Sequence, residues 1–311
     1  MTKKLLLTRK FIFLRIIMDE IDLIILKKLI ENSRVTYREL GDLVDMSVSA
    51  VHKRIKKLES DEIIEAYIAR PSAIALKYLS VLIFGTSNAK SVDTVSKELG
   101  QHESINFIGI AGAKSLIISA FLRNISELQE LSIYASNTAQ ISDPIVGIVN
   151  EPYITTPEPL TSIDYKILKT LNRNSRKPVT DIADDVGLST KTVRKRLDRM
   201  IENNLIDFGI EWTLKAENNL TTAFHIYLNE GTNLNTTIQY LYEKYSQNVT
   251  IIMSYSNIPN FLTMIIWTKT AQNSQKVQEE LQTEGFRDII PHIFLSSKYY
   301  NCWIDQLLRT K

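Results

Sequence analysis

The sequence has few of the residues that stabilise a fold covalently or through metal ions. It contains 311 residues and one cysteine, Cys302, which excludes a disulfide framework and a cysteine-rich metal site. The four histidines are scattered, and none lies at a metal-ligand spacing from another. No apolar run reaches the roughly 18 residues that a membrane-spanning helix requires. We therefore expect no cofactor, no metal, no membrane partner and a cytoplasmic location.

A strong overall charge is absent too. The formal net charge is +2, from 37 Lys and Arg against 35 Asp and Glu. Positive charge is instead concentrated on two short segments. Residues 47–58 contain four basic and no acidic residues, and residues 189–200 contain five basic residues and Asp198. Local basic segments of this kind are typical of surfaces that bind polyanions.

The two basic segments belong to an internal repeat. Residues 21–64 and 163–206 align without a gap at an offset of 142 positions, with 16 identities. The identities include Asn-Ser-Arg at 32–34 and at 174–176. Both basic segments fall at the same place in the repeat, which indicates two copies of one functional unit.

Each copy predicts three short helices. In the first copy, apolar residues at i, i+4 spacing predict a helix over 20–31. Thr36 and Glu39 form a capping box that opens a second helix, and Ser47 caps a third. In the second copy, matching helices are predicted at 162–173, 179–186 and 190–203.

Three short helices with a tight turn before a basic third helix predict a helix-turn-helix. The third helix of such a unit fits the major groove of DNA, which is about 12 Å wide. Gly187 suits the tight turn of the second copy, because that position often requires a positive φ. The alternative is a generic three-helix bundle with a solvated basic face. The same charge placement in both copies favours DNA binding.

Residues 18–76 resemble the N-terminal half of the Lrp/AsnC (feast/famine) family of transcriptional regulators. The resemblance is carried by Met18-Asp19-x-x-Asp22, Asn32-Ser33-Arg34, Leu40-Gly41-x-x-Val44-x-Met46-Ser47 and Val51-x-x-Arg54-Ile55. The second copy is similar, more weakly past Ile206. Typical members have one such half per chain, so the resemblance implies a tandem form of the family.

After each repeat, extended and helical patterns follow in the order β-α-β-β-α-β, which predicts a ferredoxin-like unit. The resemblance implies that this unit is the effector and dimerisation domain. We expect an α+β fold in which two winged, Lrp-type helix-turn-helix domains alternate with two ferredoxin-like domains. The expected segments are a basic extension at 1–17, helix-turn-helix domains at 18–66 and 161–208, effector domains at 67–150 and 209–311, and a linker at 151–160. The end of the chain, Tyr299 to Leu308, predicts a short helix on the second sheet or on a partner.

The resemblance places DNA contacts on the outer faces of the third helices. Base readout is expected from Ser49, Ala50, Lys53, Lys191, Thr192 and Lys195. Phosphate contacts are expected from Arg34, Arg176, Lys57 and Arg199, and the same faces carry Ser47, His52, Lys56, Ser189 and Arg194. Two roles stay open for the aligned pair Arg54 and Arg196, which either contact phosphates or brace the bundle.

The resemblance also implies a small-molecule effector between paired effector domains, near the loop that joins the two middle strands. The corresponding residues are Gly109, Ala111, Gly112, Ser254, Ser256 and Asn257. Neither loop has the acidic residue of the family's Gly-x-x-Asp-like turn, which disfavours an amino-acid effector.

We therefore predict a sequence-specific DNA-binding transcriptional regulator that reads two half-sites per chain and is not an enzyme. The expected partners are double-stranded DNA and a small-molecule effector. The two halves are expected to pair as an intrachain pseudo-dimer, and whole chains as homodimers. One alternative is a siroheme decarboxylase-like enzyme on the same architecture; the basic third helices and the lack of an evident pair among His102, His225 and His292 argue against it. Another is a low-specificity architectural DNA binder.

Overall fold

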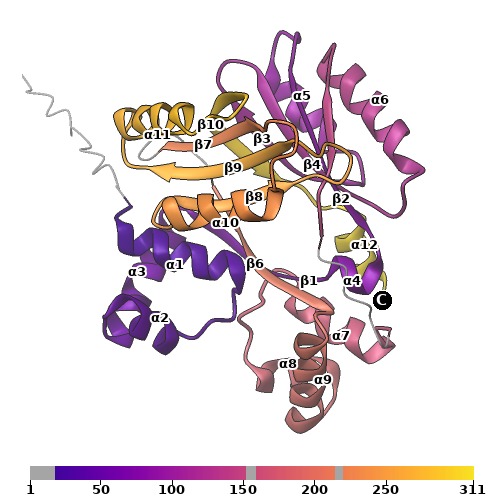
Figure 1. The fold of residues 1–311 in the computed structure, drawn as a ribbon. Helices are drawn as coiled ribbons and strands as arrows, with labels where there is room; N and C mark the ends of the chain where they lie inside the picture. Colours follow the sequence, from indigo (N-terminus) through magenta and orange to yellow (C-terminus); the bar gives the residue numbers. More distant parts are fainter. Residues whose placement is uncertain (1–17, 152–158, 214–219) are drawn as a thin grey trace, which may run out of the picture.

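The computed structural model describes residues 18–151, 159–213 and 220–311 (Figure 1). It confirms the α+β fold class, in which two helix-turn-helix units alternate with two ferredoxin-like halves. The extension predicted at 1–17 and most of the linker predicted at 151–160 lie outside the described residues.

The first helical unit contains α1(Glu20–Glu31), α2(Tyr37–Val44) and α3(Val48–Ser60). The predicted capping box is present, because Thr36 Oγ1 accepts from the Glu39 amide at 3.1 Å and Glu39 Oε2 accepts from the Thr36 amide at 2.7 Å. Ser47 caps α3 by accepting from the Ala50 amide at 3.2 Å. Hydrogen-bonded N-caps of this kind fix the residue at which each helix begins, and so set the angle of the α2–α3 turn.

The second helical unit contains α7(Ser162–Leu171), α8(Val179–Val186) and α9(Thr190–Glu202). Gly187 has φ +67° in the turn before α9, as its sequence position predicts. In the first copy the same place is taken by Asp45, with φ +52°. Aspartate is among the few side chains that tolerate the left-handed region, so both copies keep the same turn.

Each ferredoxin-like half has the predicted order of elements. The first half is β2(Leu79–Thr86), α5(Val92–Leu99), β3(Ile105–Ala111), β4(Ser115–Leu122), α6(Glu127–Ala139) and β5(Ile145–Ile148). The second half is β7(Leu220–Tyr227), α10(Leu234–Lys244), β8(Val249–Ser254), β9(Phe261–Thr268), α11(Ala271–Thr283) and β10(Asp288–Tyr299). Two helices cover one face of each sheet, and each sheet and its helices enclose a separate apolar core.

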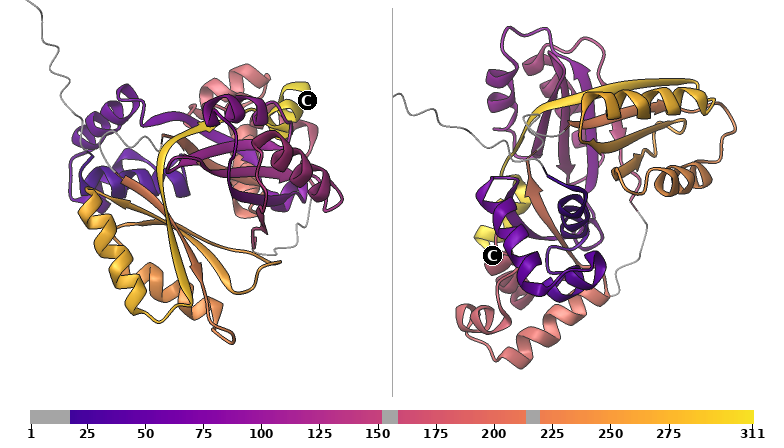
Figure 2. Two further views of the ribbon diagram at one scale, coloured as in Figure 1. Left: turned by 90° about the horizontal axis from the view of Figure 1, so that it is seen from above. Right: turned by 90° about the vertical axis from the view of Figure 1, so that its left-hand side faces the viewer.

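The two halves join within the chain. β3 pairs antiparallel with β10, which gives one eight-stranded sheet in the order β5-β2-β4-β3-β10-β7-β9-β8. On the opposite side, Val149 and Tyr255 form an antiparallel bridge just beyond the ends of β5 and β8. Phe84 of the first half packs edge-on against His225 of the second, with ring centroids 4.5 Å apart. The helix-free faces of the two halves therefore face each other, as Figure 2 shows from above.

Three described elements were not predicted from the sequence. β1(Ile64–Pro71) and β6(Ile206–Trp212) follow the two helical units and pair antiparallel with each other. The short α4(Ala73–Leu76) follows β1. The antiparallel pair ties the two helical units together at a fixed register, because a one-residue slip would turn every side chain to the opposite face.

The C-terminal helix α12(Trp303–Thr310) forms where the sequence predicts a helix, but it packs elsewhere. Its neighbours are α7 and β1 rather than the second sheet (Figure 1). Trp303 Nε1 donates to the Phe121 carbonyl at 2.8 Å, and the buried Cys302 lies in the same apolar cluster as Tyr78. The end of the chain thus returns to the first half, where it buries apolar surface that β10 leaves uncovered.

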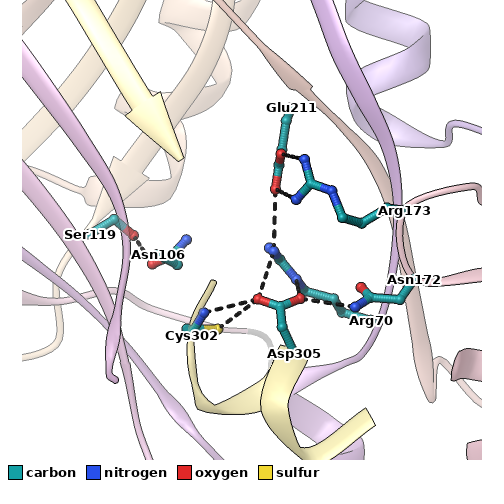
Figure 3. Close-up of polar contacts among 8 residues, drawn as sticks. All are labelled: Arg70, Asn106, Ser119, Asn172, Arg173, Glu211, Cys302 and Asp305. Carbon is teal, nitrogen blue, oxygen red and sulfur yellow. Dashed lines mark hydrogen bonds and ion pairs between the residues drawn. The ribbon is translucent and has the colours of Figure 1, made fainter. Parts of the chain in front are cut away.

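A buried ionic cluster connects α12 to the β1–β6 pair (Figure 3). Arg70 donates to both carboxylate oxygens of Asp305, at 3.0 and 3.1 Å, and to Glu211 at 3.3 Å. Arg173 holds the same Glu211 through two bonds of 3.1 and 2.6 Å. Glu211 and Asp305 are 2% and 0% exposed. Every buried carboxylate in this cluster is therefore paired, which is the condition for burying charge without a large cost.

Candidate nucleic-acid interface

The outer faces of α3 and α9 carry most of the predicted DNA-contacting side chains in exposed positions. The exposed residues are Ser47, Ser49, His52, Lys53, Lys56, Lys57, Ser189, Lys191, Arg194 and Lys195. Ala50 and Thr192 are half-buried at the N-terminal ends of these helices. Lys56 is ion-paired with Glu59 at 2.7 Å. Apolar residues on the opposite face of each helix are fully buried, so the periodicity of the helix itself turns the basic side outward.

Three arginines of these helices point inward. Arg54 binds Asp19 and the buried Asp22, both at 2.8 Å. Although burial opposes it, these two ion pairs raise the pKa of Arg54 above its ordinary value. Of the two roles left open for Arg54, the structure favours bracing the bundle, because its charge is already paired within the helical unit.

In the second copy, a different arginine reaches the equivalent aspartate. Arg199 Nη2 lies 2.5 Å from the buried Asp164, and Arg196 Nη1 lies 3.7 Å from the same carboxylate. Arg196 therefore also braces the bundle. Arg199 was expected to contact phosphate, and the structure instead pairs it inside the helical unit, because Asp164 is 0% exposed and requires a cation.

Arg34 and Arg176 were also expected to contact phosphate, and the structure places them at the junction of the two copies instead. Arg176 Nη1 donates to the carbonyls of Ser33 and Val35, at 2.7 and 3.0 Å. Reciprocally, Arg34 donates to the carbonyls of Ser175 and Lys177. A carbonyl oxygen satisfies a guanidinium N–H as a phosphate oxygen would, so Nη1 of each arginine is already used within the chain.

The remaining part of the Asn-Ser-Arg repeat completes this junction. Ser33 Oγ and Ser175 Oγ lie 2.5 Å apart, and both residues are fully buried. The Ser175 amide donates to the Tyr67 carbonyl of β1 at 3.1 Å. The identity of the three residues in both copies was the available signal, since each copy contributes the same side chains to this junction. The junction and the β1–β6 pair together fix the two helical units relative to each other.

The residues predicted to bind an effector lie along the two seams between the halves. Gly109 and Ala111 are buried in β3 where it pairs with β10, and Gly112 donates to the Ile293 carbonyl at 2.8 Å. A side chain on Gly109 would collide with Phe294. At the other seam, Ser254 and Ser256 bond to residues 148–150, and Asn257 bonds through its amide to the backbone of β5. Their observed role is to join the halves.

Two histidines meet between the sheets, contrary to the expectation that no evident pair exists. The rings of His225 and His292 lie 4.3 Å apart, because β7 and β10 are neighbours although 67 residues separate the two positions. Burial lowers the pKa of His225 to about 3, and also lowers the pKa of His292. Both rings line a cavity of about 190 Å³ between the halves. No local sequence signal predicts this pairing, because it depends on the order of the strands in the sheet.

In the described ranges, no group of three or more His, Cys, Asp or Glu side chains is placed to hold a metal ion. Across the same residues, no helix is long and apolar enough to cross a membrane.

Comparison with protein families identifies both helical units. A winged helix-turn-helix DNA-binding model matches residues 18–65, and an AsnC-type helix-turn-helix model matches residues 160–201. The matched ranges coincide with α1–α3 and α7–α9, so sequence similarity and structure agree on two units of this kind.

Individual relatives cover about one half of this chain each. An uncharacterized HTH-type transcriptional regulator of Pyrococcus furiosus is 30% identical over 116 residues, which are 36% of this chain and 78% of the relative. The HTH-type transcriptional regulator LrpA of Mycobacterium tuberculosis is 26% identical over 139 residues, 44% of this chain and 93% of that protein. Relatives that match over most of their own length thus align with less than half of this chain, as expected if this chain contains two copies of the unit.

One kind of solved structure matches almost the whole chain. The crystal structure of the siroheme decarboxylase NirDL superposes with a TM-score of 0.59 and 14% identity, covering 94% of this chain and 98% of that one. At this identity the likeness concerns the fold. It shows that two helix-turn-helix units and two ferredoxin-like halves occur together in another single structure.

Proposed function

This chain belongs to the Lrp/AsnC family of helix-turn-helix transcriptional regulators, and we propose that it binds double-stranded DNA and regulates transcription through both of its helix-turn-helix units. In this proposal α3 and α9 each enter a major groove, with their N-terminal residues at the base edges. One chain then reads two half-sites. Homodimers of the chain, with four reading helices, stay a prediction.

The observation that carries the proposal is the matched, exposed basic face of the two third helices. Lys53 and Lys195 stand at the same repeat position, and both are exposed. The arginines that brace each unit are paired internally, whereas these lysines project from it. An exposed basic face, presented twice in one frame, suits the phosphate-rich surface of DNA.

The two reading helices are not identical, so the proposed site is asymmetric. At the positions expected to reach base edges, α3 has Ser49 and Ala50 whereas α9 has Lys191 and Thr192. A lysine donates to guanine O6 and N7, whereas an alanine only contacts a thymine methyl group. The two half-sites are therefore expected to differ in sequence, unlike the palindromes that identical subunits read.

The direct test is a mobility shift on the chain's own upstream region, with random duplex as competitor, repeated across salt concentrations. For the variant K191Q/R194Q/K195Q we expect affinity to fall about 10²-fold and the slope of log K against log salt to become shallower by two to three, because each lost phosphate contact removes about one unit. The matched control is K90Q/K97Q/K276Q, which removes the same charge from exposed positions of the ferredoxin-like halves and should bind like the parent.

Each outcome of that experiment is decisive. Unchanged affinity and slope in the α9 variant would remove α9 as a reading helix. Salt-sensitive binding with no preference over random duplex would favour an architectural DNA binder. No binding at low salt would reject the proposal.

The spacing of the two half-sites provides a second prediction. Since the Asn-Ser-Arg junction and the β1–β6 pair hold the helical units in one arrangement, only one spacing should allow both to bind. An insertion of about 5 bp turns the second half-site to the opposite side of the duplex. We expect affinity to fall to that of a single half-site, as measured by footprinting and mobility shift. Equal affinity across a spacing series would show that the units move independently.

The enzymatic alternative draws support from the NirDL fold and from the His225–His292 pair. The exposed basic faces of α3 and α9 argue against it, because a decarboxylase has no need of them. We therefore propose a regulator rather than a decarboxylase. Turnover of siroheme by the purified chain would reverse this assignment.

A further inference from the structure

The cavity between the halves results from a difference between the two copies. It opens where β2, β4 and β5 of the first half face β7 and β10 of the second. Internal duplication provides a built-in comparison, since paired strand positions in one half have equivalents in the other.

Strand register identifies the equivalent positions. In the first half the β2–β4 ladder ends at the pair Thr86 and Ser115, and in the second half the β7–β9 ladder ends at the pair Tyr227 and Phe261. Both ladders contain eight pairs, so Thr86 corresponds to Tyr227 and Ser115 to Phe261. In the second half these rings pack on each other with centroids 5.0 Å apart, and Tyr255 stacks on Phe261 at 5.4 Å.

The first half thus has two small hydroxyl side chains where the second has two aromatic rings. The pocket lies beside these small side chains: Thr86 and Ser115 line it from the first half, and Tyr227 lines it from the second. The pocket is half open to solvent, and it leaves apolar side chains of its wall uncovered where a ligand can reach them. A binding role explains why the first half keeps small side chains where the second half has aromatic rings.

The size of the cavity limits what can occupy it. An engineered apolar cavity of about 150 Å³ holds a benzene molecule. The 190 Å³ available here therefore admits a molecule of about one ring with a short substituent. Phe84, Ile117 and Ile145 provide apolar walls for it.

The charge of the side chains that line the cavity indicates the chemical class of its ligand. Among the described residues, no lysine or arginine lines the cavity, and the carboxylate in its lining is the exposed Asp143. Both histidine rings are uncharged at neutral pH, because burial lowers their pKa. A carboxylate or phosphate would meet no cation here. A positive group would meet Asp143, the hydroxyls and the acceptor nitrogens of neutral imidazoles.

We propose that this cavity is a single binding site per chain for a small organic amine, about one ring in size and without a carboxylate. The site differs from the effector residues expected from the family resemblance, which join the halves. Free amino acids are expected to bind more weakly, since their carboxylate would lie near Asp143, a like charge.

The test requires no DNA, so its result is independent of the proposed function. Benzylamine is titrated into the full chain by calorimetry, with benzoate and phenylalanine as ligands of similar size that carry a carboxylate. For benzylamine we expect one site per chain with a dissociation constant between about 10 µM and 1 mM, the range open to so small a ligand. The carboxylates should bind at least ten-fold more weakly.

Two variants locate the site. Ser115→Phe copies the second half and should abolish benzylamine binding, with circular dichroism as the check on folding. Asp143→Asn leaves the shape intact and should weaken benzylamine at least ten-fold, whereas Asp93→Asn on the exposed side of α5 should not change it. Undiminished binding in the Ser115→Phe and Asp143→Asn proteins, equal binding of benzoate, or no binding of benzylamine to the parent would each overturn the proposal.

Discussion

Replacing Asp305 with alanine is expected to lower the free energy of unfolding by about 3–5 kcal/mol, because it leaves a buried arginine without its main partner. Asp305 is fully buried and accepts two bonds from Arg70 (Figure 3). The same carboxylate accepts from the Cys302 amide at 3.0 Å at the start of α12, so the variant also loses a helix cap. Urea unfolding followed by circular dichroism measures the effect.

Two comparisons separate this buried pair from an ordinary ion pair. Asp93→Ala breaks an exposed pair with Lys97 and should leave the free energy of unfolding nearly unchanged. Arg70→Met combined with Asp305→Leu replaces both charges with apolar groups and should recover much of the loss. A double variant that is less stable than Asp305→Ala would contradict this account of the cluster.

The ion pair between Arg70 and Asp305 also determines how the free energy of unfolding depends on pH. Burial tends to raise the pKa of Asp305, but Arg70 overcomes it and holds the pKa below the ordinary value of 3.8. The stabilisation is therefore complete above about pH 4 and is lost as the pH falls through the lowered value. Acid unfolding of the parent, compared with Asp305→Ala, should show this contribution only in the parent.

Lowering the pH from 6.5 to 4.5 is expected to reduce the free energy of unfolding at up to about 1.4 kcal/mol per pH unit, through His225. Burial lowers the pKa of this histidine from 6.5 to about 3, so the unfolded chain takes up a proton that the folded chain does not. The stabilisation is present above pH 6.5 and declines as the pH falls toward 3. His292, whose pKa burial also lowers, acts in the same direction.

The duplicated structure supplies the substitution that tests this. Register places His225 opposite Ile290 and Phe84 opposite Ile145, so phenylalanine already occupies the equivalent position in the first half. His225→Phe should make the stability much less dependent on pH between 6.5 and 4.5, without loss at pH 7, because Nε2 of His225 has no hydrogen-bond partner among the described residues. The control His52→Gln, on the exposed face of α3, should keep the parent's profile. An unchanged slope in His225→Phe would assign the effect to other groups.

Local elements of this fold were predictable because their signals are local. The capping box at Thr36 and the glycine turn at residue 187 each depend on residues a few positions apart, and both are present. The ferredoxin-like order was likewise visible in short runs of apolar residues. These signals determine where elements begin and end, which is why the predicted bounds of α1 and α8 match the observed ones.

Contacts between distant segments were not predictable in the same way. Arg34 and Arg176 carry the charge expected of phosphate ligands, and no sequence pattern distinguishes a phosphate oxygen from a carbonyl 141 residues away. The destination of α12 depends on which surface the rest of the fold leaves uncovered. The cavity depends on a register that aligns Ser115 with Phe261, which became visible only when both ladders were known.

The seam between β3 and β10 also changes how the assembly depends on concentration. When two separate subunits pair, the fraction assembled falls as the protein is diluted. Here the partners are tethered in one chain, so each half is present at a fixed local concentration near the other however dilute the protein is. In a cell that holds only a few copies of this chain, the two halves of each copy would still be paired.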